Sequence, residues 1–205
     1  MNAIDRAQIE AKSVASFAAG YFRHIGQVLG RVDLAAVEEL AEELTTARNA
    51  GATVFVAGNG GSATTAATMA NDLGFDVVKK NGIEEPFRIL AITENTAVIS
   101  AVANDVGYEN VFLNQLRIHF RPGDRLLVIS ASGNSQNLIR AAQWVRKRNG
   151  RVLGLLGFDG GALLEMCDVV VHVPTEIGEY GPVEDAHLVV NHVLAHWFQG
   201  ALRES

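Results

Sequence analysis

The chain has 205 residues, of which 48% are hydrophobic and 20% charged, with a formal net charge of −6 at pH 7. This composition is typical of a folded protein and excludes a disordered one. Acidic and basic residues are interspersed, so the charge pattern does not indicate nucleic-acid binding. Cys167 is the only cysteine, so no internal disulfide can form and we expect a reducing, cytoplasmic setting. No stretch is apolar and long enough to predict a membrane span.

Helices and strands are predicted to alternate along most of the chain. Residues from about 6 to 50 predict two helices with a break near 30–33. Almost continuous apolar runs then predict five strands buried on both faces, near 53–57, 87–92, 125–130, 151–156 and 168–173. Amphipathic segments predict helices near 62–73, 95–103, 109–118 and 135–149, with a last helix from about 182 to 203.

This alternation determines the expected fold class. Strands separated by helices pair in parallel through right-handed crossovers. We therefore predict an α/β fold, a three-layer αβα sandwich around a five-stranded parallel doubly wound sheet. Residues 1–50 are expected to form an N-terminal helical arm that packs on the core or on a neighbouring subunit, and residues 51–205 the ligand-binding domain. Phe17, Tyr21 and Ile25 give the arm more apolar surface than a solvated helix needs.

Two turns rich in glycine and serine each lie between an apolar strand and a helix. The first reads Gly58-Asn59-Gly60-Gly61-Ser62, and the second Ser130-Ala131-Ser132-Gly133-Asn134-Ser135. Such turns point backbone N–H groups and hydroxyls outward at the start of a helix, where the helix dipole favours an anion. Glycine and serine are also ordinary turn and N-cap residues, but the pair of turns predicts a phosphorylated ligand.

Both turns follow strands of one predicted sheet, so they are expected at the same edge. In open α/β sheets, ligands bind beyond the carboxyl ends of the strands. Thr93-Glu94-Asn95 ends the strand near 87–92 and places a carboxylate at this edge. A carboxylate does not help to bind an anion, so we expect Glu94 to contact hydroxyl groups or to move protons.

Several motifs occur here in the same order as in sugar isomerase (SIS) domain proteins. They are the two turns with Asn137, the stretch Asn104-Asp105-Val106-Gly107-Tyr108, and Asp159-Gly160-Gly161. From about residue 35 to 200 the chain resembles, more narrowly, the phosphoheptose isomerases, which convert sedoheptulose 7-phosphate to a glycero-manno-heptose 7-phosphate. The resemblance implies the SIS fold, isomerase activity, and a homotetramer whose pockets are shared between subunits.

The resemblance also implies roles for the two turns. The substrate phosphate would be held by four serines of the two turns: Ser62, Ser130, Ser132 and Ser135. Ala131 is also expected among the substrate-binding residues. The sugar would be lined by the remaining residues of the first turn and by the end of the next strand: Asn59, Gly60, Gly61, Thr93 and Glu94.

A zinc site and an acid/base set are implied at four further positions. In the family, a histidine and a glutamate follow the first turn, and a glutamine and a histidine lie on the last helix. These positions are Thr68, Asp72, Glu184 and His192 here, and only His192 is unchanged. Thr68 is a poor zinc ligand, so the expected metal set reduces to Asp72, Glu184 and His192. The same three residues are the expected catalytic residues.

The reaction can be argued from chemistry alone. An aldose–ketose interconversion moves a proton between adjacent carbons through an enediol, which requires a base at carbon and an acid at the neighbouring oxygen. Asp72 projects from the helix that begins at the first turn, and Glu184 and His192 are two turns apart on one face of the last helix. The three could converge as an acid/base set or hold a metal. Each also has a plainer interpretation. Asp72 could be a solvated carboxylate, Glu184 an acid in the first turn of a helix, and His192 merely one of three histidines on that helix.

Two other functions stay open. A non-catalytic SIS module could bind a sugar phosphate or a protein partner, and the altered metal-site residues favour it. A dinucleotide enzyme is the third candidate, because Gly58, Gly60 and Ala63 match the G-x-G-x-x-A fingerprint. That fingerprint expects an acid at the end of the next strand, whereas Glu84 and Glu85 precede it.

Overall fold

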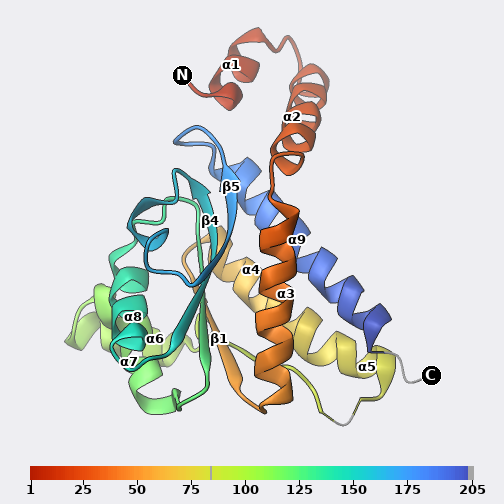
Figure 1. The fold of residues 1–205 in the computed structure, drawn as a ribbon. Coiled ribbons are helices and arrows are strands. Elements are labelled where there is room, and N and C mark those ends of the chain that lie inside the picture. The colour runs from red at the N-terminus through yellow and green to blue at the C-terminus, as the bar shows by residue number, and fades with distance from the viewer. Residues whose placement is uncertain (84, 203–205) are drawn as a thin grey trace.

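The computed structural model describes residues 1–83 and 85–202, and a five-stranded parallel sheet lies at its centre (Figure 1). The strands are β1 (Thr53–Gly58), β2 (Arg88–Ala91), β3 (Arg125–Ser130), β4 (Arg151–Phe158) and β5 (Val169–Pro174). They run in the order β2-β1-β3-β4-β5, and every neighbouring pair is parallel. The predicted fold class is therefore confirmed, and all five strands lie where the apolar runs placed them.

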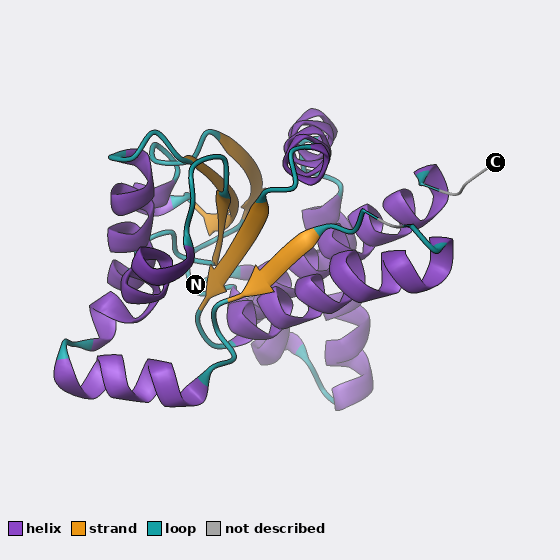
Figure 2. Cartoon of the chain, turned by 90° about the horizontal axis from the view of Figure 1, so that it is seen from below, coloured by secondary structure: helices purple, strands orange, loops and turns teal. Residues whose placement is uncertain are grey.

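Helices cover both faces of this sheet and complete the three layers (Figure 2). On one face, α3 (Leu34–Asn49), α4 (Gly61–Met69) and α9 (Tyr180–Ala201) pack against Val54 and Val56 of β1. On the other face, α7 (Val111–His119) and α8 (Gln136–Arg146) pack against Phe55 and Ala57, with α6 (Thr96–Asp105) beside them. Alternate residues of β1 thus enter opposite cores, as expected for a strand buried on both sides.

The N-terminal segment forms three helices rather than the two predicted. They are α1 (Ala3–Glu10), α2 (Val14–Leu29) and α3. The missed boundary lies at Ser13, whose hydroxyl accepts a hydrogen bond from the Ser16 backbone N–H and starts α2. α1 and α2 extend beyond the carboxyl edge of the sheet, whereas α3 packs on the sheet itself (Figure 1).

The helix after β1 is longer and less regular than predicted. α4 continues without a break into a π-helix (η1, Ala70–Asp76) and then α5 (Val77–Asn81), so the helical segment extends past the predicted end at 73. π-helical turns insert an extra residue into a helix and are frequent at functional sites. Residue 203, the predicted end of the last helix, lies outside the described residues, and α9 ends at Ala201.

The strand order fixes the position of the ligand-binding edge. The chain passes outward from β1 to β2 and then crosses back to β3 on the other side of β1. The crossover direction therefore changes between β1 and β3, and ligands bind at this point in doubly wound sheets. The two serine-containing turns follow these two strands. None of the helices in the described part of the chain could cross a membrane.

Candidate active site

The second turn, between β3 and α8, is built to present hydroxyls and N–H groups. The Oγ of Ser130 accepts a hydrogen bond from the backbone N–H of Gly133 at 3.0 Å. Gly133 has a φ of +63°, and a side chain there would collide with the Gly160 carbonyl group. The turn ends at Ser135, the N-cap of α8, whose side chain makes no capping bond. The Leu138 N–H is bonded to the Asn137 side chain, so the N–H groups of Gln136 and Asn137 are the ones that keep their capacity to bind an anion.

The first turn, between β1 and α4, is fixed against the second by an amide pair. Asn59 and Asn137 exchange hydrogen bonds of 3.0 and 2.8 Å between their side-chain amides. The hydroxyl of Tyr108 also donates to the Oδ1 of Asn59 at 2.9 Å. α4 begins at Gly60 without a side-chain cap, as α8 does at Ser135. Two uncapped helix N-termini thus point into one region, which favours a ligand with negative charge.

A small cavity of about 100 Å³ lies between the two turns. Its lining includes Tyr180 and Ile129 together with seven residues predicted from the sequence: Asn59, Ser62, Ser130, Ala131, Ser132, Ser135 and Glu184. The structure therefore brings the four predicted phosphate-binding serines together. Ser62 and Ser130 are themselves buried, so few water molecules compete for their hydroxyls.

Glu184 reaches this cavity from the second turn of α9, not from the first turn as the predicted helix start near 182 implied. Its carboxylate lies against Gly61 so closely that a side chain at position 61 would displace it. Burial raises the pKa of Glu184, and the neighbouring Asp185 raises it further.

Thr93 and Glu94 lie outside the lining of the cavity. The Thr93 hydroxyl reaches the backbone carbonyl of Ala63 at 3.5 Å, and Glu94 is exposed in the loop after β2. β2 is an edge strand, so its loop lies further from the switch point than the loops of β1 and β3.

Asp72 of η1 and His192 of α9 form a second cluster, further along the two helical segments that begin at the cavity. The Nε2 of His192 lies 3.6 Å from the Oδ2 of Asp72, with side-chain exposures of 50% and 14%. The same oxygen accepts a hydrogen bond from the amide of Asn191 at 2.7 Å, and Asn71 donates to Oδ1 at 3.0 Å. A carboxylate and an imidazole at this distance can exchange protons with a substrate placed between or beside them.

The predicted zinc set does not assemble in this chain. Within the described residues, no three His, Cys, Asp or Glu side chains lie close enough to hold a metal ion together. Glu184 lies two helical turns from His192, at the cavity of the serine turns, and so does not join Asp72 and His192. Thr68 donates its hydroxyl to the backbone carbonyl of Thr64 at 3.0 Å. The residues present do not fit a zinc site, and we derive no step through a metal.

Comparison with known proteins identifies the family. The chain matches the SIS domain family over residues 20–157. It is 36% identical over 167 residues to the phosphoheptose isomerase of Rhodospirillum rubrum, which covers 82% of this chain and 86% of that protein. The chain belongs to the phosphoheptose isomerase family of SIS-domain proteins. A further family member, from Mycobacterium tuberculosis, is 36% identical over 84% of this chain and 85% of its own length.

The fold comparison agrees with this membership. The structure of a phosphoheptose isomerase from Neisseria gonorrhoeae superposes with a TM-score of 0.81 at 26% identity, covering 91% of this chain and 98% of that one. Membership of the family also disfavours a dinucleotide enzyme. Glu85 precedes β2 instead of ending it, and Glu84 lies outside the described residues.

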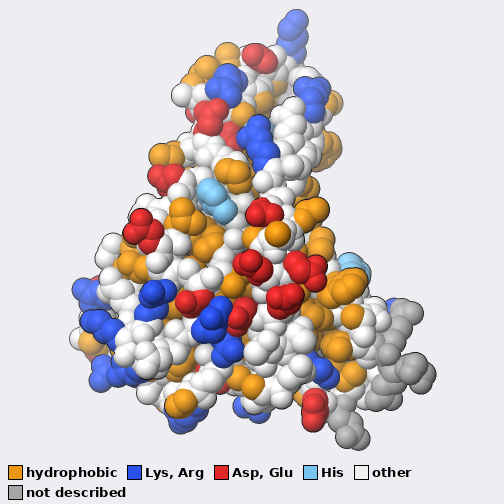
Figure 3. Space-filling model, viewed as in Figure 1, with side chains coloured by type: hydrophobic (Ala, Val, Ile, Leu, Met, Phe, Trp, Pro, Cys, Tyr) orange, Lys and Arg blue, Asp and Glu red, His pale blue; other side chains and the backbone are white. Residues whose placement is uncertain are grey.

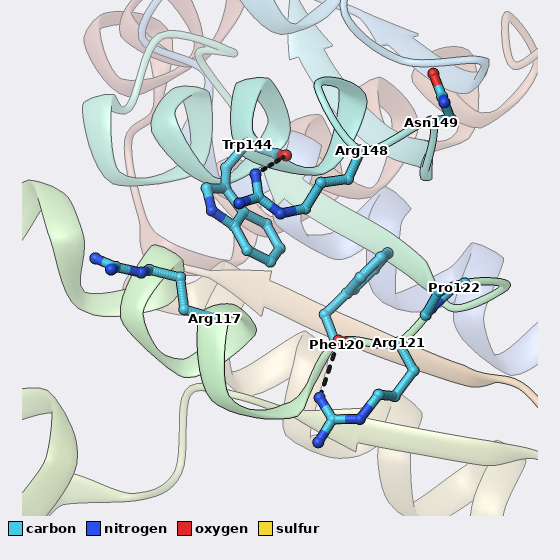
Figure 4. A pocket seen from close by; sticks show the side chains of 7 residues that line it. All are labelled: Arg117, Phe120, Arg121, Pro122, Trp144, Arg148 and Asn149. Atoms are coloured by element: carbon cyan, nitrogen blue, oxygen red, sulfur yellow. Dashed lines mark hydrogen bonds between the residues drawn. The ribbon is translucent and has the colours of Figure 1, made fainter.

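A larger groove, of about 500 Å³, lies at the opposite edge of the sheet (Figure 4). Arg117, Arg121 and Arg148 line it with two aromatic side chains. The guanidinium carbon of Arg148 lies 3.8 Å from the centre of the Trp144 ring, and Arg148 also donates a hydrogen bond to the Trp144 carbonyl. Arg121 donates a hydrogen bond to the carbonyl of Phe120. Two of these arginines therefore bind carbonyl groups where α7 and α8 end, and helix ends of this polarity favour cations. We assign this groove a structural role.

Sequence reasoning missed Tyr180 and Asn191. Tyr180 stacks edge-on against Phe158 and lines the cavity, but a tyrosine at the start of a helix carries no signal of its own. Asn191 did carry one, because it is a polar residue on the face of α9 that otherwise presents Val190, Leu194 and Phe198 to the core.

Proposed function

We propose that this chain is an aldose–ketose isomerase that acts on a sugar phosphate, with sedoheptulose 7-phosphate as its substrate. One observation carries the proposal: a carboxylate–imidazole pair stands further along the two helices that start at a serine-lined cavity. The serines and the uncapped ends of α4 and α8 suit a phosphate ester. Asp72 and His192 suit the transfer of a proton at a distant carbon.

The spacing of these two parts supports a long substrate. Glu184 lines the cavity and His192 follows it by two turns of α9, about 12 Å along the helix axis at 1.5 Å per residue. The phosphate and the reacting carbons must therefore lie at opposite ends of an extended molecule. A three-carbon sugar phosphate is too short for this arrangement, whereas a seven-carbon chain phosphorylated at its last carbon has the required length.

Asp72 and His192 supply the two proton transfers of the reaction. The carboxylate of Asp72 removes the proton from the carbon beside the carbonyl group and returns it to the adjacent carbon. The imidazole of His192 donates a proton to the carbonyl oxygen and recovers one from the neighbouring hydroxyl, so the enzyme ends each turnover in its starting state. Protonation of that oxygen removes the enediolate charge, which is the main barrier to the reaction.

A series of ketose phosphates tests the proposal. We expect the purified protein to convert sedoheptulose 7-phosphate to an aldose phosphate with a kcat/KM that exceeds those for fructose 6-phosphate and dihydroxyacetone phosphate. The aldose product is followed by ¹³C NMR. Turnover of none of these ketoses, together with binding in calorimetry, would favour the non-catalytic SIS module. The occupation of the family's histidine position by Thr68 gives that second candidate its support.

The assembly is proposed to be a homotetramer with shared active sites. Leu34, Val37, Val193 and Trp197 line an apolar groove between α3 and α9, and Trp197 is 60% exposed. In Figure 3, apolar side chains lie beside the acidic side chains of α3 on this side of the molecule. A second copy of the chain has a matching apolar surface by symmetry.

Replacement of Trp197 tests the assembly. Light scattering should give a tetramer for the natural chain and a smaller species for Trp197→Glu, because the variant places a charge in the apolar contact. Ile118→Glu is the matched control, since Ile118 is equally exposed but lies on α7. A natural chain that remains monomeric at high concentration would count against shared sites.

A further inference from the structure

Asn191 is a fully buried amide in an apolar layer. Its exposure is 0%, and its neighbours Val190, Leu194 and Ala195 belong to the core between the sheet and α9. A buried polar side chain is costly unless its donors and acceptors are bonded. Within the described residues its Oδ1 has no hydrogen-bond partner, so the amide is only partly satisfied. Packing alone would favour leucine here, and the polar group requires another explanation.

The bond that Asn191 does make goes to Asp72. Its Nδ2 donates to the Oδ2 of Asp72 at 2.7 Å, and this oxygen is the one that faces the Nε2 of His192. Asn191 and His192 are consecutive on α9, so one helix fixes both partners of the same carboxylate oxygen. A carboxylate oxygen can accept more than one hydrogen bond, and the bond to Asn191 therefore leaves Oδ2 able to take a proton.

The hydrogen bond from Asn191 also matters because the helix that carries Asp72 is irregular. Asp72 lies in the π-helix η1, where the regular spacing of the helix is interrupted. Its other oxygen is bonded to Asn71, but Asn71 is exposed and also donates to Asp76, so water competes for it. Asn191 is the buried donor, and a buried hydrogen bond fixes a side chain more firmly than an exposed one.

We propose that Asn191 is a positioning residue, which holds the Asp72 carboxylate in register with His192. The inference rests on the proposed function, because it assigns to Asn191 the alignment of that acid/base pair. Asn191 touches no reacting atom. Its contribution is to keep Asp72 at one orientation during both proton transfers, and small misplacements of catalytic groups lower rates strongly.

Asn191→Leu is the direct test. Leucine has a similar volume and removes only the amide, so the variant is expected to bind substrate with an unchanged KM while kcat falls about 10- to 100-fold. Asn71→Ala is the matched control, because it removes the exposed donor from the other oxygen of Asp72, and its kcat should stay near that of the natural chain. An Asn191→Leu variant with the natural kcat overturns the inference.

A kinetic double-mutant cycle separates positioning from general damage. In the Asp72→Asn background there is no carboxylate to align, so adding Asn191→Leu should leave the residual kcat unchanged. An equal loss in both backgrounds would mean that Asn191 only supports the fold, and would overturn the inference. Failure of the natural chain to turn over any sugar phosphate would instead refute the proposed function, which the ketose series tests separately.

The contact itself can be measured without substrate. Unfolding free energies of the natural chain, Asn191→Leu, Asp72→Ala and the double variant form a second cycle. We expect the double variant to be less destabilised than the sum of the two single variants, because the second change removes a bond already lost. Additive effects would show that the two side chains are not coupled and would overturn the inference.

Discussion

Replacement of His192 by alanine should lower kcat for sedoheptulose 7-phosphate by about 10²- to 10⁴-fold, the usual contribution of a general acid or base. Asp72→Asn should cause a loss of the same order, since an amide cannot accept the proton from carbon. The KM should change little in both variants, because the serines that bind the phosphate lie at the other end of the site. Steady-state kinetics with a product assay measures both parameters.

His196→Ala is the matched control for this result. His196 lies on the same helix one turn beyond His192 and is also exposed, but no acidic side chain pairs with it among the described residues. The kcat of the His196→Ala variant should equal that of the natural chain. If His192→Ala retains full turnover while its fold is intact, the proposed acid/base role of the imidazole is wrong.

Stability should fall in acid because of His187. This histidine lies on α9 with no exposed surface, and burial lowers its pKa from 6.5 to about 4. The unfolded chain therefore binds a proton near pH 6.5 that the folded chain does not bind until about pH 4. Stability is complete above pH 6.5 and decreases as the pH falls, by up to about 3 kcal/mol near pH 4.

Urea denaturation at pH 8 and pH 5 measures this effect. His187→Leu should lose about 2 kcal/mol less stability between the two pH values than the natural chain, because it has no buried imidazole to protonate. His196→Leu removes an exposed histidine and should behave like the natural chain. The other titratable groups contribute equally to the pH dependence of all three proteins. Identical pH dependence in His187→Leu and the natural chain would therefore show that His187 is not the cause.

The fold followed from the sequence because each strand is a nearly continuous apolar run buried on both faces. The order of strands and helices then left few topologies, and the turns after β1 and β3 could be placed at one edge. The boundary at Ser13 and the π-helix at Ala70–Asp76 could not be predicted in the same way. Both depend on local hydrogen bonds that the hydrophobic periodicity does not reveal.

The sequence predicted individual site residues better than it predicted how they are arranged relative to one another. The four serines follow from local turn chemistry and do meet at one cavity. Convergence of Glu184 with Asp72 and His192 does not occur in this chain, because two turns of α9 separate Glu184 from His192. Helical spacing gives the face of a residue but not its height relative to a second helix. The sequence shows Asn191 as a polar residue on an apolar helix face, but its partner Asp72 is known only from the tertiary contact between η1 and α9.

Exchange of hydrogen at the reacting carbons is the most direct measurement of the central claim. In D₂O, a base that forms an enediol exchanges the proton it removes with solvent during some turnovers. We predict that the natural chain catalyses the incorporation of deuterium at the carbon next to the carbonyl group of sedoheptulose 7-phosphate. The ¹H NMR signal of the hydrogen on that carbon is then lost. The Asp72→Asn variant should not catalyse this exchange. Binding of the ketose without any incorporation, and without an aldose product, would contradict the account.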